Sequence, residues 1–446
     1  MPLADARAKS PYLRTTYAVW ELTLKCNLRC IHCGSRAGPC RPAELSTAEA
    51  MDLVHQLAEV GVAEVSLIGG EAFLRPDWLD IAREIRACGM RLTMTTGGFG
   101  VGPKMAERMA EAGFAGVSVS VDGLEHTHDF LRGRSRSFEW AFRAIEAIRA
   151  AGMKCSANTQ LNRLSAAQLP RIYALLHAAQ VYSWQVQMTV PMGHAADRPE
   201  LLLQPWELLD LFPVLHYLWL RGAEERPYMY PGNNIGYFGP YERRFRTIEG
   251  MGTEAVGFWR GSTAGILTLG IEADGTIKAD PSLPTDDYAG GNIRDQSLRE
   301  IVYAADQLTF NDEFGTGHLW GFCGGCEFAE VCRGGDTWTA HVFFDRNGNN
   351  PYCHHRALHH AAREVRELVT LRTPAAGVPF DNGVFETHEL ARPHWREDPD
   401  GFTLADVDWP DAWLAEDPEL PARLAAERDR SVEAWRRTRL GQRAAS

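Results

Sequence analysis

The sequence lacks the features of several large protein classes. No apolar run approaches the roughly 18 residues that cross a membrane, and the first 25 residues contain no apolar segment of the kind found in secretory signal peptides. No basic stripe for nucleic acid is present either, because 46 Lys and Arg face 58 Asp and Glu, a net charge of -12. The sequence therefore predicts a cytoplasmic protein that binds neither membranes nor nucleic acid.

The composition is that of a globular chain. Of 446 residues, 45% are hydrophobic and 23% are charged, which predicts two or three compact units with large cores. The acidic excess is concentrated, because the segment from Asp381 to Glu419 holds 12 acidic and 2 basic residues. We expect this segment to pack on the body or on a partner, because it also carries aromatic residues: Phe385, Trp395, Phe402, Trp409 and Trp413.

Residues 17–195 alternate strand-like and helix-like stretches, which predicts a parallel sheet or barrel. One face of successive strands is polar, as in Ser156, Asn158 and Gln160. We expect this face to line a wet or ligand-filled interior, the alternative being the solvent-facing side of an open sheet. The predicted strands are 17–25, 62–68, 90–96, 116–121, 154–161 and 183–190, and amphipathic helices are predicted at 48–60 and 138–151.

Seven of the ten cysteines fall into two clusters, which favours metal binding over disulfides. Cys26, Cys30 and Cys33 follow the first predicted strand. Three thiolates can hold three irons of a 4Fe-4S cluster and leave the fourth open to an exogenous ligand, whereas a zinc site is the alternative. The second cluster is Cys323, Cys326, Cys332 and Cys353, and we expect the remaining Cys40, Cys88 and Cys155 to be buried small hydrophobes.

The first cluster and the motifs after it resemble the radical S-adenosylmethionine (SAM) superfamily. The Cys-x3-Cys-x2-Cys spacing with an aromatic residue before the last cysteine matches the family signature, and Gly69-Gly70-Glu71 matches the motif that receives the SAM amino group. Ser120-x-Asp122-Gly123 with His128 and Arg132 resembles the segment that contacts SAM ribose and carboxylate. The resemblance implies an open (β/α)6 partial TIM barrel, reductive cleavage of SAM, and cofactor contacts at His32, Gly69, Gly70, Glu71, Ser120, Asp122, Arg132, Asn158 and Pro191.

The second cysteine cluster resembles the SPASM domain of peptide-modifying members of this superfamily, which usually holds two auxiliary clusters. The four ligands of the outer cluster are present, but Ser262, Asp280 and Asp336 stand where the inner cluster has cysteines. Oxygen ligands replace thiolates poorly around iron-sulfur, so we expect one auxiliary 4Fe-4S cluster and not two. Asp280 and Asp336 become candidate catalytic acid-base residues or ligands for a cationic group, the alternative being a water-filled polar patch.

These patterns divide the chain into five parts. We expect an N-terminal extension at 1–16, the α/β radical SAM barrel at 17–195, and a connector helix and loop at 196–260. A smaller Cys-rich α+β SPASM-like domain at 261–372, ending in a helix over 355–371, is followed by the acidic, aromatic-containing tail at 373–446.

The resemblance favours a radical SAM enzyme that abstracts hydrogen from a ribosomally made peptide during maturation. Flavodoxin or ferredoxin is the expected electron donor. Only 25 residues precede Cys26, so we expect a separate leader-binding protein or a small-molecule substrate. The alternatives are a dehydrogenase, epimerase or rearranging enzyme acting on a sugar, nucleoside or amino-acid derivative in natural-product biosynthesis, and a non-catalytic iron-sulfur sensor.

Overall fold

The computed structural model describes residues 16–246, 259, 261–392, 394 and 401–444. Apart from Thr16, the predicted N-terminal extension lies outside these residues, as does Trp395 of the acidic segment. None of the helices in these ranges has the length and apolar character needed to span a membrane.

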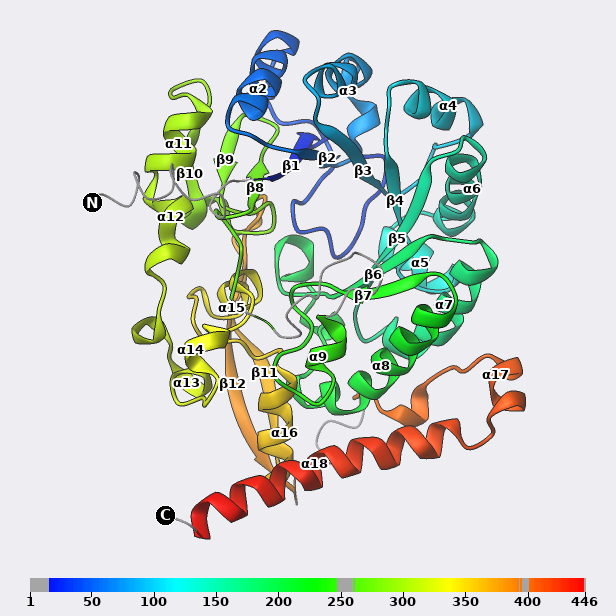
Figure 1. Cartoon of the computed structure of the whole chain (residues 1–446), viewed down its shortest axis with the longest axis vertical. Coiled ribbons are helices and arrows are strands. Elements are labelled where there is room, and N and C mark those ends of the chain that lie inside the picture. The colour runs from blue at the N-terminus through cyan, green and yellow to red at the C-terminus, as the bar shows by residue number, and fades with distance from the viewer. Residues whose placement is uncertain (1–15, 247–258, 260, 393, 395–400, 445–446) are drawn as a thin grey trace.

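A ten-stranded open sheet organises the molecule and curves around its interior (Figure 1). Its order is β10-β9-β8-β1-β2-β3-β4-β5-β6-β7. The strands from β8 to β7 in this order run parallel, whereas β9 pairs antiparallel with both β8 and β10. This confirms the predicted α/β class with an open parallel barrel sheet. The strands are β1 (Tyr17–Thr23), β2 (Glu64–Gly69), β3 (Arg91–Thr96), β4 (Gly116–Ser120), β5 (Lys154–Leu161), β6 (Ser183–Met188), β7 (Tyr228–Pro231), β8 (Thr268–Ile271), β9 (Thr276–Lys278), β10 (Ala289–Asn292), β11 (Val365–Thr373) and β12 (Val384–Ala391).

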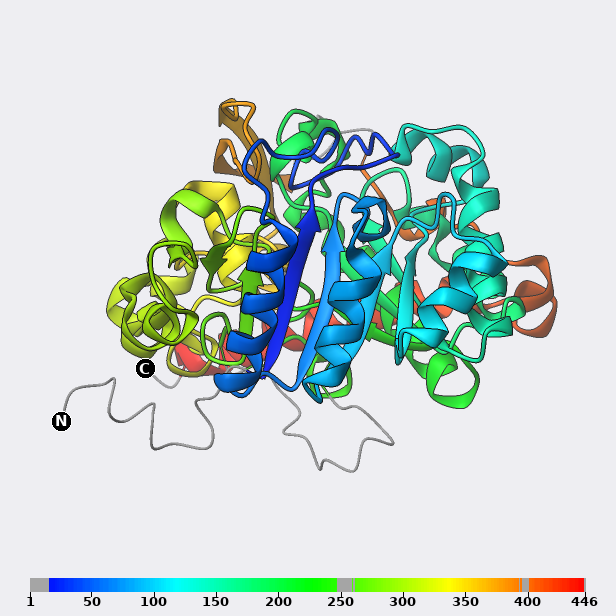
Figure 2. The same cartoon turned by 90° about the horizontal axis from the view of Figure 1, so that it is seen from above.

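Helices cover the outer face of the sheet, as Figure 2 shows for the helices beside β1 and β2. The first begins at a capping box, in which Glu49 N donates to Ser46 Oγ and Ser46 N donates to the Glu49 carboxylate. The helices are α2 (Thr47–Glu59), α3 (Trp78–Ala87), α4 (Pro103–Glu111), α5 (Glu125–Arg132), α6 (Ser137–Ala150), α7 (Leu169–Ala178), α8 (Leu208–Glu224), α9 (Glu242–Phe245), α10 (Thr285–Tyr288), α11 (Leu298–Ala304), α12 (Asp306–Glu313), α13 (Gly321–Gly324), α14 (Ala329–Cys332), α15 (Thr337–Phe344), α16 (His354–Ala362), α17 (Asp411–Glu416) and α18 (Leu420–Ala444).

The inner face of the sheet is polar and half-exposed. Along β5, residues alternate between buried positions and half-exposed ones such as Ser156, Asn158 and Gln160. Ser156 pairs with Ser118 on β4 and with Ser183 on β6, so the polar positions form rows across neighbouring strands. The interior of the barrel can therefore hold a polar ligand, as the sequence pattern indicates.

The predicted helix over 355–371 is wrong in its second half. Helix α16 ends at Ala362, and β11 pairs antiparallel with β12 from Val365 onwards. Glu364 has a φ of 59°, a left-handed conformation that ends the helix. The nine residues of β11 include two valines and two threonines, which favour a strand once a partner strand is available.

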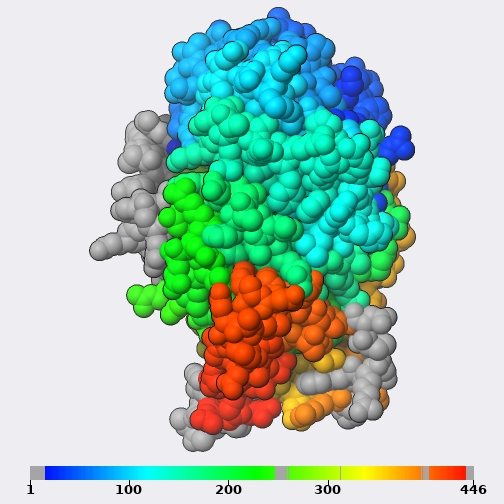
Figure 3. Space-filling model, turned by 90° about the vertical axis from the view of Figure 1, so that its right-hand side faces the viewer, coloured from blue at the N-terminus to red at the C-terminus, as the bar shows by residue number. Residues whose placement is uncertain are grey.

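The acidic C-terminal segment packs on the body of the protein, as its aromatic residues predict. Phe385, Phe402, Trp409 and Trp413 are buried. Trp413 contacts Tyr173 of α7 edge-on. Helix α18 lies against α8 and α16, and Figure 3 shows the C-terminal residues, in orange and red, seated on the green and cyan parts of the chain.

Replacing Trp413 with alanine is expected to destabilise the fold. The change removes a buried aromatic ring and leaves a cavity, which costs about 3–5 kcal/mol. The Tm of the purified protein should fall by several degrees in Trp413→Ala. Leu220→Ala, at an exposed site on helix α8, is the control. Equal Tm values for the two variants would contradict the packing described.

Candidate functional site

Cys26, Cys30 and Cys33 lie in the loop that follows β1, at the carboxyl end of the parallel strands (Figure 2). The loop closes on itself, because Cys26 N donates to Gly38 O at 2.8 Å and Gly38 N donates to Leu24 O at 3.0 Å. The carboxyl ends of parallel strands are where barrel enzymes place their active sites.

Each of the three sulfur atoms accepts a hydrogen bond from a nitrogen donor. Burial raises the pKa of Cys26 and Cys30 to about 12, so a bound cation is needed to keep these thiols deprotonated at neutral pH. The donors are Leu28 N to Cys26 at 3.4 Å, Arg132 Nη1 to Cys30 at 3.7 Å, and Ala37 N to Cys33 at 3.3 Å.

The spacing of the thiols favours a cluster over a single zinc ion. Sulfur ligands of a tetrahedral zinc lie roughly 4 Å apart, since each Zn–S bond is about 2.3 Å long. Within the ranges that the structure covers, no three cysteine sulfurs lie within 4.8 Å of one another. The three thiols are therefore not gathered as closely as the ligands of one tetrahedral zinc ion, and a donor set of three cysteines suits an iron-sulfur cluster.

A chain of buried charges runs from the cysteine loop into the sheet. Arg132, at the end of α5, contacts Cys30 and forms an ion pair of 2.6 Å with Asp122, which follows β4. His32 Nε2 lies 3.1 Å from the same carboxylate oxygen. Burial alone would raise the pKa of Asp122, but Arg132 and His32 together lower it below its ordinary value. Asp122 is therefore ionised at neutral pH and balances the buried charge of Arg132.

Unsatisfied polar atoms mark this region as a ligand site. Among the residues that the structure describes, His32 Nδ1, Arg132 Nε and His128 Nε2 are buried and make no hydrogen bond. Burying a polar atom without a hydrogen-bond partner costs free energy, so a polar ligand bound beside these three atoms would supply their missing hydrogen bonds. His128 lies within the motif after β4 but is not among the predicted cofactor contacts.

Glu71 lies at the carboxyl end of β2, directly beneath the cysteine loop. Its carboxylate accepts hydrogen bonds from Thr96 Oγ1 at 2.5 Å and Gly97 N at 2.7 Å. Burial raises its pKa to about 7. A Cβ on Gly69 or Gly70 would lie 2.2 Å from a backbone oxygen at the end of β1, so the two glycines let β2 approach the start of the loop.

The three other predicted contacts lie on the inner face or at strand ends of the same sheet. Ser120 pairs with Asn158 across β4 and β5, and Pro191 opens the turn after β6. In that turn His194 N donates to Cys33 O at 2.9 Å, and His194 Nδ1 lies 3.0 Å from Cys30 O. No local motif in the sequence marks His194, so this residue is not among the predicted site residues. The roles of all these residues as cofactor contacts stay predictions.

The second cysteine cluster is assembled from three short helices. Cys323 lies in α13, Cys326 follows it, Cys332 ends α14, and Cys353 precedes α16. All four line one pocket. Asn350 N donates to Cys323 at 3.5 Å, and burial raises the pKa of Cys353. Four thiols around one space fit a cluster whose coordination the protein completes.

Asp336 and Asp280 lie close enough to interact electrostatically, but each also has a local structural role. Asp336 caps α15, accepting from Thr339 N and Thr339 Oγ1 at 3.0 Å each, and Asp280 accepts from Ser282 N at 3.0 Å. Burial, with a smaller contribution from the neighbouring Asp280 carboxylate, raises the pKa of Asp336 to about 6. Ser262 accepts from Ala264 N at 3.3 Å. The structure thus brings the two carboxylates together, while their catalytic role stays a prediction.

The three remaining cysteines differ in exposure. Cys155 is buried, as predicted, and Cys88 is half-buried. Cys40 is exposed, so the prediction of a buried hydrophobe is wrong there, because the residue lies in the outer part of the loop after β1.

Known proteins are similar to this chain over most of its length. Residues 20–162 match the family model of the radical SAM superfamily. The chain is 29% identical to the AdoMet-dependent heme synthase of Methanosarcina barkeri over 345 residues, which are 76% of this chain and 95% of that protein. It is 33% identical to the Fe-coproporphyrin III synthase of the same organism over 336 residues (71% and 82%).

Two further similarities concern a protein named a maturase and a protein solved with a precursor peptide. The mycofactocin maturase MftC of Mycobacterium tuberculosis is 28% identical over 323 residues, which are 71% of this chain and 76% of that protein. Streptococcus suis SuiB, solved with its precursor peptide SuiA, shares the fold with a TM-score of 0.58 at 15% identity, over 77% of this chain and 76% of that one.

Replacing Asp122 with asparagine is expected to weaken SAM binding at least tenfold. The change leaves the buried Arg132 without its counter-ion and His32 without its carboxylate partner. Calorimetric titration of SAM into the reconstituted protein measures the effect, and iron content shows whether the cluster has assembled. Glu125→Gln, on the exposed face of α5, is the control. Unchanged affinity in Asp122→Asn would contradict the assignment.

Proposed function

The chain belongs to the radical SAM superfamily, and from this premise we propose that it modifies a peptide by hydrogen abstraction. Cys26, Cys30 and Cys33 would hold a 4Fe-4S cluster, which would supply the one-electron reduction needed to cleave SAM and start hydrogen abstraction from the substrate. The observation that carries the proposal is the meeting of three thiols with the His32–Asp122–Arg132 chain at the carboxyl ends of the strands.

The residues around the thiols bind and orient SAM in this proposal. SAM carries an amine and a carboxylate, which need an acidic and a cationic partner. Glu71 is the acidic one, held in place by Thr96 and Gly97, and Arg132 is the cationic one, held by Asp122. The polar inner face of β4 and β5 supplies the buried Ser120 and the half-exposed Asn158 to the same interior.

The four cysteines of the second cluster hold one auxiliary 4Fe-4S cluster in this proposal. Two features support it: the four thiols line one pocket, and no three of them come within the spacing of a single zinc ion. The inner auxiliary cluster is missing, because Ser262, Asp280 and Asp336 replace its cysteines.

Iron content tests this arrangement. Protein reconstituted without oxygen should hold about eight irons per chain, counting four per cluster. Cys30→Ala and Cys353→Ala should each lose about four irons, whereas Cys40→Ala, at an exposed cysteine, should lose none. A value near twelve, with three cluster signals in Mössbauer spectra, would contradict the loss of the inner cluster.

A peptide is the substrate that we propose, with a flavodoxin or ferredoxin as electron donor and a separate protein to recognise the leader. MftC, which is named a maturase, and the shared fold of SuiB, solved with a precursor peptide, support a peptide substrate. Asp280 and Asp336 would then supply acid and base at the substrate.

A tetrapyrrole is the second candidate substrate, within the small-molecule alternative. Two relatives of this chain are named a heme synthase and an Fe-coproporphyrin III synthase, and the latter is 33% identical. This candidate keeps the same thiols and SAM contacts and changes only what occupies the barrel interior.

Reduction with dithionite in the presence of SAM tests the proposed chemistry. Formation of 5'-deoxyadenosine, measured by mass spectrometry, is the expected result, and its absence from protein with a full iron content would favour an iron-sulfur sensor. Deuterium transfer into 5'-deoxyadenosine then identifies the substrate. Transfer from a deuterated precursor peptide encoded beside the gene supports maturation, and transfer from deuterated iron-coproporphyrin III supports the tetrapyrrole.

Asp280→Asn and Asp336→Asn are expected to lower substrate turnover at least tenfold while 5'-deoxyadenosine still forms. Asparagine keeps the cap of α15 but removes the charge and the proton-transfer group. Asp286→Asn, at an exposed position between the two, is the control. Normal turnover in both variants would remove the two carboxylates from the mechanism.

A further inference from the structure

Asp287, His341 and Asp345 converge where α10 meets the end of α15. His341 Nε2 lies 3.3 Å from Asp287 Oδ2 and 3.7 Å from Asp345 Oδ1. One ligand atom from each of the three residues lies within 4.8 Å of the others. Nitrogen and oxygen ligands of a tetrahedral metal ion lie about 3.4 Å apart when each bond is about 2.1 Å long, so these separations suit a shared ion.

His341 is prepared as a ligand from its other side. Its side chain is 6% exposed, and its buried Nε2 faces the carboxylates of Asp287 and Asp345 at ion-pair distances. The Tyr288 hydroxyl lies 3.1 Å from Nδ1, and the Tyr288 ring contacts the imidazole edge-on at 5.2 Å. A partner on the remote ring nitrogen is what fixes the orientation of metal-bound histidines.

The two carboxylates leave the site open to solvent. The side chains of Asp287 and Asp345 are 54% and 60% exposed, so an ion can reach the buried histidine from outside. Asp345 has a φ of 52°, a left-handed conformation, and Asn382 Nδ2 donates to its Oδ1 at 3.2 Å. The left-handed backbone of Asp345 and the hydrogen bond from Asn382 thus hold the Asp345 carboxylate beside His341.

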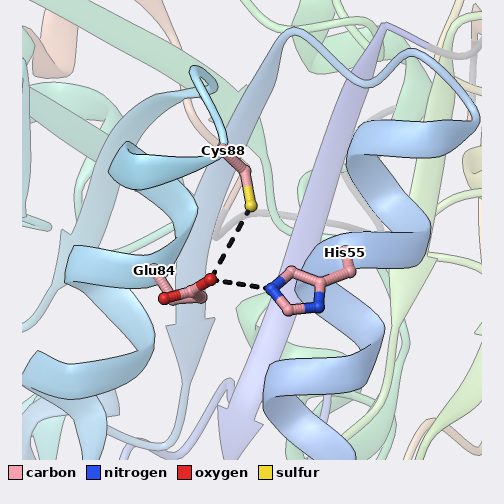
Figure 4. Close-up of side chains that lie close together, drawn as sticks. All are labelled: His55, Glu84 and Cys88. Carbon is pink, nitrogen blue, oxygen red and sulfur yellow. Dashed lines mark hydrogen bonds and ion pairs between the residues drawn. The ribbon is translucent and has the colours of Figure 1, made fainter.

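A second group of possible ligands lacks these features. His55, Glu84 and Cys88 lie together between α2 and α3 (Figure 4). There His55 Nε2 already makes a 2.7 Å hydrogen bond with Glu84, and the histidine side chain is 55% exposed. His55 and Glu84 are therefore already hydrogen-bonded to each other, and this group lacks the buried histidine of the first group.

We propose that Asp287, His341 and Asp345 bind one divalent transition-metal ion, outside the thiol sites. One imidazole nitrogen and two carboxylate oxygens suit Mn²⁺ or Zn²⁺. The ion joins α10 to α15. Asp280 shortly precedes α10, and Asp336 caps the start of α15. The ion therefore holds together α10 and the end of α15, which follow the two candidate catalytic carboxylates in the chain.

Mn²⁺ titration of the reconstituted holoenzyme, followed by EPR, tests the site. Free Mn²⁺ gives a six-line signal, and oxidised 4Fe-4S clusters do not overlap it. The wild-type protein should remove one Mn²⁺ per chain from this signal, and Zn²⁺ should release it. Asp287→Asn and Asp345→Asn, both at exposed positions, should raise the Kd at least tenfold, whereas the neighbouring Asp286→Asn should leave it unchanged.

Three results would overturn the proposal. The first is a wild-type protein that leaves the six-line signal undiminished at millimolar Mn²⁺. The second is equal Mn²⁺ binding by Asp287→Asn and Asp286→Asn. The third is loss of Mn²⁺ binding in Glu84→Gln. His341→Ala extends the test to the third ligand and should also raise the Kd for Mn²⁺. The iron content of this variant shows whether it has folded. Because the readout is Mn²⁺ and not SAM cleavage, its failure is separate from failure of the proposed function.

Discussion

The buried pair of Arg132 and Asp122 is the interaction on which the site depends. Taking both charges out of water is expensive, and each is stabilised chiefly because the other lies 2.6 Å away. Removing one partner of such a pair costs about 3–5 kcal/mol, because the other stays buried without compensation. Through Cys30 and His32 the pair also connects the cysteine loop to the end of β4, so the sheet fixes where the thiols lie.

A second charge cluster fixes the outer side of the same loop. Arg36 forms two hydrogen bonds with Asp197, at 2.5 and 2.9 Å, and two with Asp381, at 2.8 and 3.2 Å. Asp197 follows β6, and Asp381 begins the acidic C-terminal segment. This segment therefore does more than cover the body of the protein, because its first carboxylate helps to hold the loop that carries the three thiols.

The sequence predicted the parts of the structure that local patterns determine. The six central strands, the capped helix after Ser46 and both cysteine clusters follow from periodicity and spacing, and the residues of the Arg132–Asp122 pair follow from the family resemblance. The short strands β7 and β8 were missed, because four residues carry little pattern and form a strand only by pairing with β6 and β1. The strand after Glu364 was predicted as helix for the same reason, since only pairing with β12 decides its conformation.

Contacts between distant segments were likewise beyond the sequence. His194 reaches the carbonyls of Cys30 and Cys33 only because the turn after β6 lies against the cysteine loop. The convergence of Asp287, His341 and Asp345 depends on how α10 packs on α15, and no spacing in the chain marks it.

The central claim is that three thiols hold a cluster with one iron open to SAM. Electron-nuclear double resonance on the reduced protein, with SAM labelled with ¹⁵N at its amino group, tests this claim most directly. The account predicts a hyperfine coupling between the labelled nitrogen and the cluster, which should vanish in Cys30→Ala. A reduced cluster that shows no coupling to bound SAM, or a single zinc ion on the three thiols, would contradict it.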